Sequence, residues 1–146
     1  MDDGPTGPGH FNTLTENLSI TINAVNDAPV VTSAGTVSVA ENQTGVATVT
    51  SSDVDGGAPM YSISGGADAA RLVIDSATGA LSFVSAPDFE APSDADADNV
   101  YEVTVQVADG NGGFDTQALS VTVSDIASTL LVTTTSDAAD AGITDG

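Results

Sequence analysis

The stretch Tyr101-Glu102-Val103-Thr104-Val105-Gln106-Val107 alternates apolar and polar residues along its whole length. This period of two is that of a β-strand with one face on a core, whereas the apolar residues of an amphipathic helix recur every three or four positions. Residues 119–124 alternate in the same way. The turn-forming sequence Asp109-Gly110-Asn111-Gly112-Gly113 lies between the two runs, so together they predict a β-hairpin.

Shorter alternating segments precede this hairpin, and clusters of Gly, Asp and Asn separate them. The sequence therefore predicts seven strands, over residues 36–40, 46–51, 60–64, 71–74, 80–84, 100–108 and 116–124. Short strands with turns every eight to twelve residues are typical of an immunoglobulin-like Greek-key β-sandwich. A barrel is the weaker alternative, because the strands differ much in length and show no shear pattern.

The flanks are expected to lie outside this sandwich, which we assign to residues 29–126. Residues 1–28 are expected to be a tail with the last strand of a preceding domain, since Leu18, Ile20 and Ile22 alternate, followed by the linker Asn26-Asp27-Ala28-Pro29. Residues 127–146 are expected to be a linker and the start of a following repeat. The predicted architecture is thus all-β, with partial flanking strands.

Charge excludes several classes of partner. The formal net charge is -20, with 21 Asp and Glu against the single basic residue Arg71. Such a chain repels nucleic acids and anionic membrane surfaces. It has no cysteine, so disulfides and thiolate metal sites are excluded, yet 40% hydrophobic residues supply a core. No apolar run approaches the length of a membrane span, and the composition is compatible with an extracellular location.

The acids gather at two ends of the predicted sandwich. If consecutive strands are antiparallel, alternate loops lie at the same end. We call the end that receives the linker the incoming end; it collects Asn26, Asp27, Asp53, Asp55 and Asp109. We call the opposite end the outgoing end; it collects Glu41, Asp88, Glu90, Asp94, Asp96, Asp98 and Asp125.

Crowded carboxylates with almost no basic residue favour a bound cation, and calcium accepts six to eight mixed oxygen ligands in irregular geometry. Zinc would need His or Cys, and His10 is the only candidate; magnesium prefers fewer protein ligands. The alternative is that acidic loops cap their own turns and keep the protein soluble. We prefer that interpretation for Asp68 and Asp75.

Six ordered motifs resemble a cadherin repeat, and together they cover about residues 29–126. They are Val39-Ala40-Glu41-Asn42, Asp53-Val54-Asp55-Gly56, Tyr61-Ser62-Ile63, Ile74-Asp75-Ser76-Ala77-Thr78-Gly79, Pro87-Asp88-Phe89-Glu90 and Val107-Ala108-Asp109-Gly110. The Asp- and Thr-rich style and the Asn-Asp-Ala-Pro linker resemble the cadherin-like repeats of large bacterial surface proteins and adhesins.

The resemblance implies calcium between successive domains. One site would take Asp53, Asp55 and Asp109 with Asn26 and Asp27 of the linker, and the other Glu41, Asp88, Glu90 and Asp125. The incoming linker is shorter than the family's, and the outgoing linker lacks its Asn-Asp pair. The run Asp94-Ala95-Asp96-Ala97-Asp98-Asn99 is additional to the animal pattern. Either it supplies the oxygens that the outgoing linker lacks, or it is a solvated acidic loop; both interpretations remain open.

We therefore expect a calcium-binding structural and adhesive module of a cell-surface protein, with neighbouring repeats as partners and no catalytic activity. The alternative is a carbohydrate-binding β-sandwich, in which Phe114 is the one candidate exposed ring. Tyr61, Phe83, Phe89 and Tyr101 fall at expected core positions, and Tyr101 is a candidate tyrosine-corner residue. An acid-rich halophilic surface is a further alternative, but its acids would spread over whole faces.

Overall fold

The computed structural model describes residues 17–127, and its centre is the predicted hairpin. Strand β8 (Val100–Ala108) pairs antiparallel with β9 (Phe114–Ser124), in a register that sets Tyr101 opposite Val121. These two strands are flanked by β2 (Thr36–Ala40) and β5 (Met60–Gly65) in a four-stranded sheet of order β2-β9-β8-β5. The alternation seen in the sequence therefore places one face of this sheet on the core.

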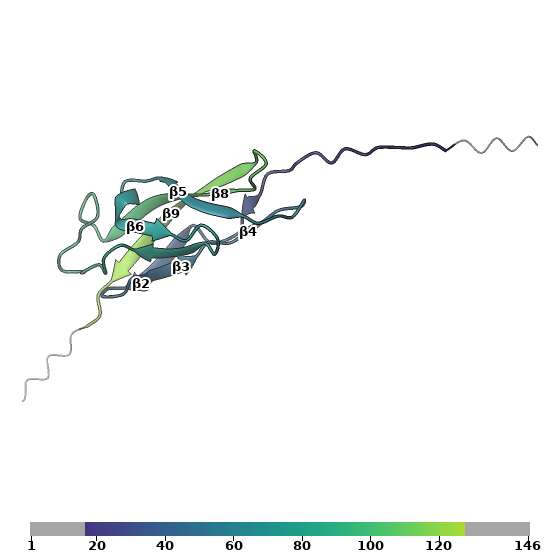
Figure 1. Cartoon of the computed structure of the whole chain (residues 1–146). Helices are drawn as coiled ribbons and strands as arrows, with labels where there is room; N and C mark the ends of the chain where they lie inside the picture. The colour runs from purple at the N-terminus through teal and green to yellow at the C-terminus, as the bar shows by residue number, and fades with distance from the viewer. Residues whose placement is uncertain (1–16, 128–146) are drawn as a thin grey trace, which may run out of the picture.

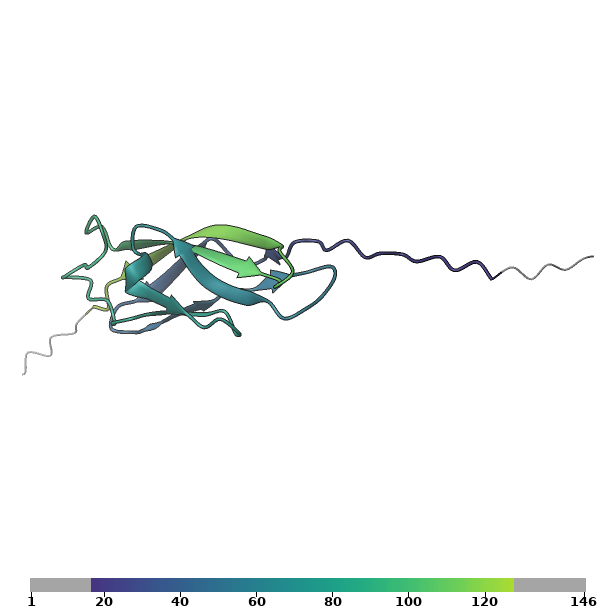
Figure 2. The same ribbon diagram turned by 45° about the horizontal axis from the view of Figure 1, so that its top comes forward.

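A second sheet of three strands completes the sandwich (Figure 1, Figure 2). Its order is β3-β7-β6, with β3 at Gly45–Thr48, β7 at Ala80–Phe83 and β6 at Leu72–Ile74. A short 3-10 helix, η1 (Ala69–Arg71), precedes β6. The all-β class is confirmed, and the sheets form a sandwich instead of a barrel.

The pairing of β2 with β9 matters most for the site. These strands run parallel, in register from Thr36 opposite Ser120 to Ala40 opposite Ser124. Both strands therefore finish at the same end of the sandwich. The backbone N–H of Glu41 donates to the carbonyl of Ser124 at 3.0 Å, which brings Glu41 beside the outgoing chain.

Both tyrosines and Phe83 lie in the core, as the sequence predicts. Tyr101 is 1% exposed, and its ring meets that of Phe83 edge to face with centroids 4.9 Å apart. The Tyr101 hydroxyl lies 3.1 Å from Ser93 Oγ and accepts the backbone N–H of Ser93 at 3.3 Å. This bond back to an upstream loop is the tyrosine-corner arrangement. Phe89 is partly buried against the same core.

Two short strands differ from the sequence prediction. The strand expected over residues 46–51 divides into β3 and β4 (Ser51–Ser52), and β4 pairs with the unpredicted β1 (Val30–Val31). Strand β1 is too short to show an alternation, so only its partner defines it. The described part therefore has nine strands where seven were predicted.

The two flanks leave opposite ends of the sandwich (Figure 1). Residues 17–29 belong to no strand, and Leu18, Ile20 and Ile22 are largely exposed. Their assignment to a preceding domain stays a prediction. The segment that was expected to begin a following repeat, from residue 128 onward, lies outside the described residues, as do residues 1–16.

Candidate metal centres

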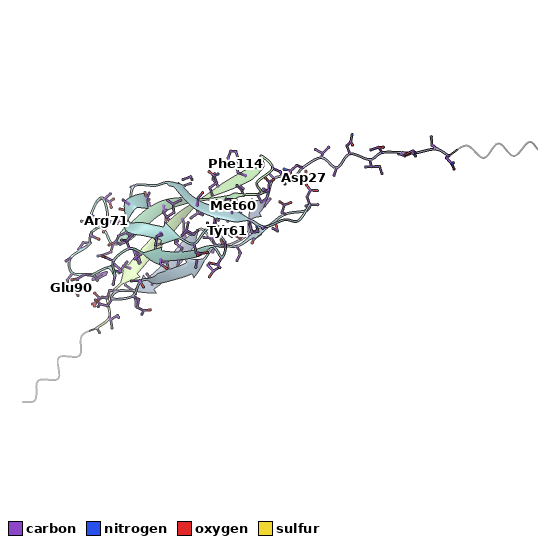
Figure 3. The ribbon with its side chains drawn as sticks, viewed as in Figure 1. Asp27, Met60, Tyr61, Arg71, Glu90 and Phe114 are labelled. Atoms are coloured by element: carbon purple, nitrogen blue, oxygen red, sulfur yellow. The ribbon has the colours of Figure 1, made fainter. Side chains whose placement is uncertain are left out.

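At the incoming end the linker touches both acidic loops. Asn26 Nδ2 donates to Asp109 Oδ2 at 2.6 Å, and the backbone N–H of Asp27 donates to Asp55 Oδ2 at 2.6 Å. The N–H of Asp55 in turn donates to Asp53 Oδ1 at 2.9 Å. The structure thus joins the five residues that the sequence assigned to this end in two hydrogen-bonded sets, Asn26 with Asp109 and Asp27 with Asp55 and Asp53, and Figure 3 labels Asp27 among them. Among the described residues, only the acids of the outgoing end form groups of three whose carboxylate oxygens lie within 4.8 Å of one another.

A small cavity lies under the linker. Its volume is about 90 Å³, and Asp53, Asp109 and Pro29 are among the residues that line it. The linker approaches closely because Gly113 has no side chain: a Cβ there would lie 2.8 Å from the Cα of Ala28. A chamber of this size is large enough for a cation or a few waters.

The Asp109 carboxylate accepts hydrogen bonds from several groups of the chain itself. The side-chain amide of Asn26 is the largest influence that lowers the pKa of Asp109, followed by the backbone N–H of Asn111. Asn111 and Gly113 donate to Asp109 Oδ1 at 2.6 and 3.0 Å. These hydrogen bonds therefore favour the ionised form of Asp109.

At the outgoing end Glu41 joins two segments. It lies just after β2 and is only 4% exposed. Its Oε2 accepts the N–H of Phe89 at 3.0 Å, and its Oε1 accepts the N–H of Ile126 at 3.1 Å. These backbone donors, Phe89 first, lower the pKa of Glu41. One buried carboxylate thus ties the loop between β7 and β8 to the departing chain.

Further carboxylates surround Glu41. Carboxylate oxygens of Glu41, Asp88 and Glu90 lie within 4.8 Å of one another, and the charge of Asp125 also acts on Glu90. Calcium–oxygen distances are 2.3–2.6 Å, so two ligands of one ion stand at most about 5 Å apart. The spacing and the all-oxygen donor set therefore fit a calcium ion.

Repulsion is visible at Glu90, which Figure 3 labels. The nearby backbone N–H of Glu90, which donates to Asp88 Oδ1 at 3.1 Å, lowers the pKa of Glu90, but desolvation and the negative charges of Glu41, Asp125 and Asp88 outweigh it. The net result is a pKa above the ordinary value of 4.5. A cation at this end would remove the cost of that repulsion.

The run from Asp94 to Asp98 forms a second group of the same kind, with carboxylate oxygens also within 4.8 Å of one another. Burial opposes ionisation of Asp94, but backbone donors, first that of Asp98, hold its pKa below the ordinary value. The charge of Asp98 is the main cause that raises the pKa of Asp96. The structure therefore sorts the outgoing acids into two groups.

Asp68 has a role that sequence reasoning missed. We expected it to cap a turn or to add solubility, but it is only 3% exposed. Its carboxylate accepts the N–H of Ala95 at 2.7 Å and that of Glu102 at 2.8 Å, so it anchors the acidic run to β8. The sequence signal of such a close approach is Gly66, because a Cβ at this position would overlap the backbone of Glu102 and Val103 in β8.

Asp75 behaves as predicted for a turn residue. Its Oδ1 accepts the N–H groups of Ala77 and Thr78, at 3.0 and 2.8 Å, and the Thr78 hydroxyl at 2.9 Å. The Thr78 N–H is the largest cause that lowers the pKa of Asp75. This acid is satisfied within its own turn, so we assign it to no metal centre.

The surface also bears on the other function classes. Phe114 is 60% exposed and is the one aromatic residue among the exposed large hydrophobic side chains of residues 17–127. A sugar site built on stacked aromatic rings is therefore not evident in this part of the chain. No helix in this part is long and apolar enough to cross a membrane.

Comparison with known proteins identifies relatives of the sandwich. Residues 26–122 match the profile of a family described as bacterial Ig domain. The chain is also similar to halomucin of Haloquadratum walsbyi, with 37% identity over 98 residues, which are 64% of this chain and 1% of halomucin. The matched family region begins at Asn26, so it includes the linker residues that contact Asp55 and Asp109.

Solved structures with the same fold are cadherin domains. Human protocadherin-24 EC1-2 matches with a TM-score of 0.57 and 22% identity over 68% of this chain and 44% of that structure. Drosophila N-cadherin EC1-4 matches with a TM-score of 0.58 and 20% identity over 69% of this chain and 25% of that structure. This chain thus spans less than half of each, and the likeness confirms the cadherin-like fold that the motifs indicate.

Proposed function

Because this chain belongs to the bacterial Ig domain family and folds like a cadherin repeat, we propose that it is a calcium-binding structural module of a cell-surface protein. Neighbouring repeats of the same polypeptide are its partners. Calcium ions at the incoming and outgoing ends fix the angle between successive repeats, so that the series forms an extended, adhesive rod.

The observation that carries this proposal is the position of the acids relative to the path of the chain. Asn26 and Asp27 contact Asp109 and Asp55 where the chain enters the sandwich, and Ile126 contacts Glu41 where it leaves. An ion bound at either end would therefore touch the linker as well as the domain. Such a site couples calcium binding to the stiffness of the junction.

Calcium is the cation that this donor set favours. The candidate ligands are carboxylate and amide oxygens, and the sequence has no cysteine to attract zinc. Extracellular modules bind calcium with dissociation constants of about 10⁻⁴–10⁻³ M, so millimolar external calcium would occupy them. We therefore place the protein outside the cell.

A structural role also suits the environment of the acids better than catalysis. General acid–base catalysis requires one carboxyl group with a raised pKa facing a substrate cleft. Here Glu90, whose pKa is raised, lies against other carboxylates at the end of the sandwich, next to the departing chain. The same arrangement suits a cation shared between carboxylates.

The direct test is whether calcium orders the incoming linker. In the 146-residue chain labelled with ¹⁵N, we expect the heteronuclear NOE of the Asn26, Asp27 and Ala28 amides to rise when calcium replaces EDTA. The Ile126 amide should respond in the same titration. Linker amides that do not change up to about 10 mM calcium, well above the expected dissociation constants, would contradict the proposal.

Two double variants separate the ends. Asp53→Asn with Asp55→Asn should abolish the response of the linker amides and leave that of Ile126. Asp88→Asn with Glu90→Gln should do the reverse. Both variants remove two charges and keep an acceptor oxygen at each position, so a general effect of charge would appear equally in both.

A further inference from the structure

The acidic run between Pro87 and β8 has a feature that the proposed junction sites do not explain. Asp94 is only 8% exposed, and its Oδ1 is fully buried without a hydrogen-bond partner. Its other oxygen, Oδ2, accepts the N–H of Asp98 at 2.8 Å. A buried carboxylate oxygen without a partner is costly, because it has lost its water and gained nothing in exchange.

The rest of the run places more oxygen around this buried carboxylate. Carboxylate oxygens of Asp94, Asp96 and Asp98 lie within 4.8 Å of one another, the range in which ligands of one calcium ion stand. At the end of the run, Asn99 Oδ1 is also buried and unpartnered, while its Nδ2 donates to the carbonyl of Phe89 at 3.1 Å. The unpartnered atoms here are acceptors, so the missing partner is a donor or a cation.

The fold holds this arrangement in place from both sides. Asp68 accepts the N–H of Ala95, and the Tyr101 hydroxyl accepts that of Ser93, so the start of the run is fixed to buried side chains. Ala97 and Asn99 both adopt the left-handed conformation, with φ of 61° and 64°, so the backbone turns within the run. The three carboxylates are therefore held together despite their mutual repulsion.

We propose that Asp94, Asp96 and Asp98 form a calcium site internal to this domain, independent of any neighbouring repeat. All of its carboxylates come from one loop, so it needs no ligand from a linker. Asn99 and backbone carbonyls of the loop would complete the oxygen shell.

The test follows the amides of residues 94–99 during a calcium titration of the ¹⁵N-labelled 146-residue chain. We expect saturable shifts of these amides with a dissociation constant of about 10⁻³ M or below. In Asp96→Asn with Asp98→Asn, the shifts should not saturate below about 10 mM, a weakening of at least about tenfold. The responses of Asn26, Asp27 and Phe89 should remain.

The matched control is Asp88→Asn with Glu90→Gln, which removes two charges from the neighbouring group and should leave the shifts of residues 94–99 unchanged. Amide spectra in EDTA show whether each variant is folded. If the double variant does not fold, Asp96→Asn alone, at an exposed position, gives the same comparison. If the shifts are lost in the control, the run belongs to the outgoing junction. If the unmodified chain shows no shifts, the run is a solvated loop. Either result would overturn the proposal.

Discussion

The incoming and outgoing ends of the sandwich are both acidic, but the surroundings of their carboxylates differ. At the incoming end, Asp109 receives the side-chain amide of Asn26 and backbone donors, which lower its pKa. At the outgoing end, Glu90 faces Glu41, Asp125 and Asp88, and these charges contribute to a raised pKa. The chain supplies donors to Asp109 at one end and to Glu41 at the other, but only at the outgoing end does a carboxylate, that of Glu90, keep a pKa raised by neighbouring charges.

This difference indicates at which end a bound cation stabilises the fold most. An ion at the incoming end replaces hydrogen bonds that already exist, so part of its binding free energy is offset. An ion at the outgoing end relieves the repulsion that still raises the pKa of Glu90, although Glu41 beside it already accepts two backbone donors. We therefore expect calcium to stabilise the outgoing end more strongly than the incoming end.

The largest effect is expected from the anchor of the outgoing loop. Asp68→Ala leaves the N–H groups of Ala95 and Glu102 without an acceptor, and two such losses should lower the free energy of unfolding by about 3 kcal/mol. Asp115→Ala is the control at the incoming end, where Asp115 accepts the N–H of Val31 at 2.9 Å and, in an exposed bond to its neighbour, that of Thr116 at 2.8 Å. That variant should lose only about 1 kcal/mol in urea unfolding. Equal losses would show that the loop does not depend on Asp68.

The next effect separates the ends by their response to calcium. In EDTA, Asp88→Asn with Glu90→Gln should melt at a higher temperature than the unmodified chain, because it removes repulsion between carboxylates. In calcium, it should lose the stabilisation of about 1.4 kcal/mol that one site provides at ten times Kd. Asp53→Asn with Asp55→Asn should not melt higher in EDTA, since it weakens the hydrogen bonds that Asp53 and Asp55 accept from backbone N–H groups and relieves no repulsion like that at Glu90. Thermal melts followed by circular dichroism measure both. A rise in EDTA for both variants would remove the distinction between the ends.

A smaller effect concerns one donor at the incoming end. Asn26→Ala removes the amide that most lowers the pKa of Asp109, so that pKa should rise toward its ordinary value of 3.8. The ¹³C shift of the Asp109 carboxyl during an acid titration measures this change. Asn111→Ala is the control, because the backbone N–H of residue 111 remains and the pKa should not move. An unchanged titration in Asn26→Ala would mean that the linker does not hold Asp109.

The smallest effect lies in a turn that belongs to neither metal centre. The folded protein lowers the pKa of Asp75 below 3.8, so its ionised form stabilises the fold at neutral pH, and this stability is lost as the pH falls through the folded pKa. Asp75→Asn should therefore melt slightly lower at pH 7, and the difference should vanish in acid. Calcium should not alter the difference. A gap that persists below the folded pKa would show that ionisation of Asp75 is irrelevant.

Alternation predicted most of the fold. The period of two located the β8–β9 hairpin and its core residues, because side chains of a strand alternate between its faces whatever the rest of the chain does. Antiparallel order then placed Asp53, Asp55 and Asp109 at one end and Glu41, Asp88 and Glu90 at the other. The contacts of the described residues bring each set together.

What the sequence did not predict depends on contacts between distant segments. The roles of Asp68 and β1 arise only when residue 95 approaches residue 68 and residue 30 approaches residue 52. The division of the outgoing acids into two groups likewise depends on how the loop after Pro87 is folded, and the left-handed residues Ala97 and Asn99 set that shape. Local patterns carry no information on such distances.

The most direct test of the account is a calorimetric melt of the 146-residue chain in EDTA and again in about 10 mM calcium, at the same ionic strength. If calcium occupies the ends, the melting temperature should rise by about 5–10 °C for each site filled to ten times its Kd. Equal concentrations of magnesium should give a smaller rise. Superimposable melts in EDTA and calcium would contradict the central claim that these acids are ligands.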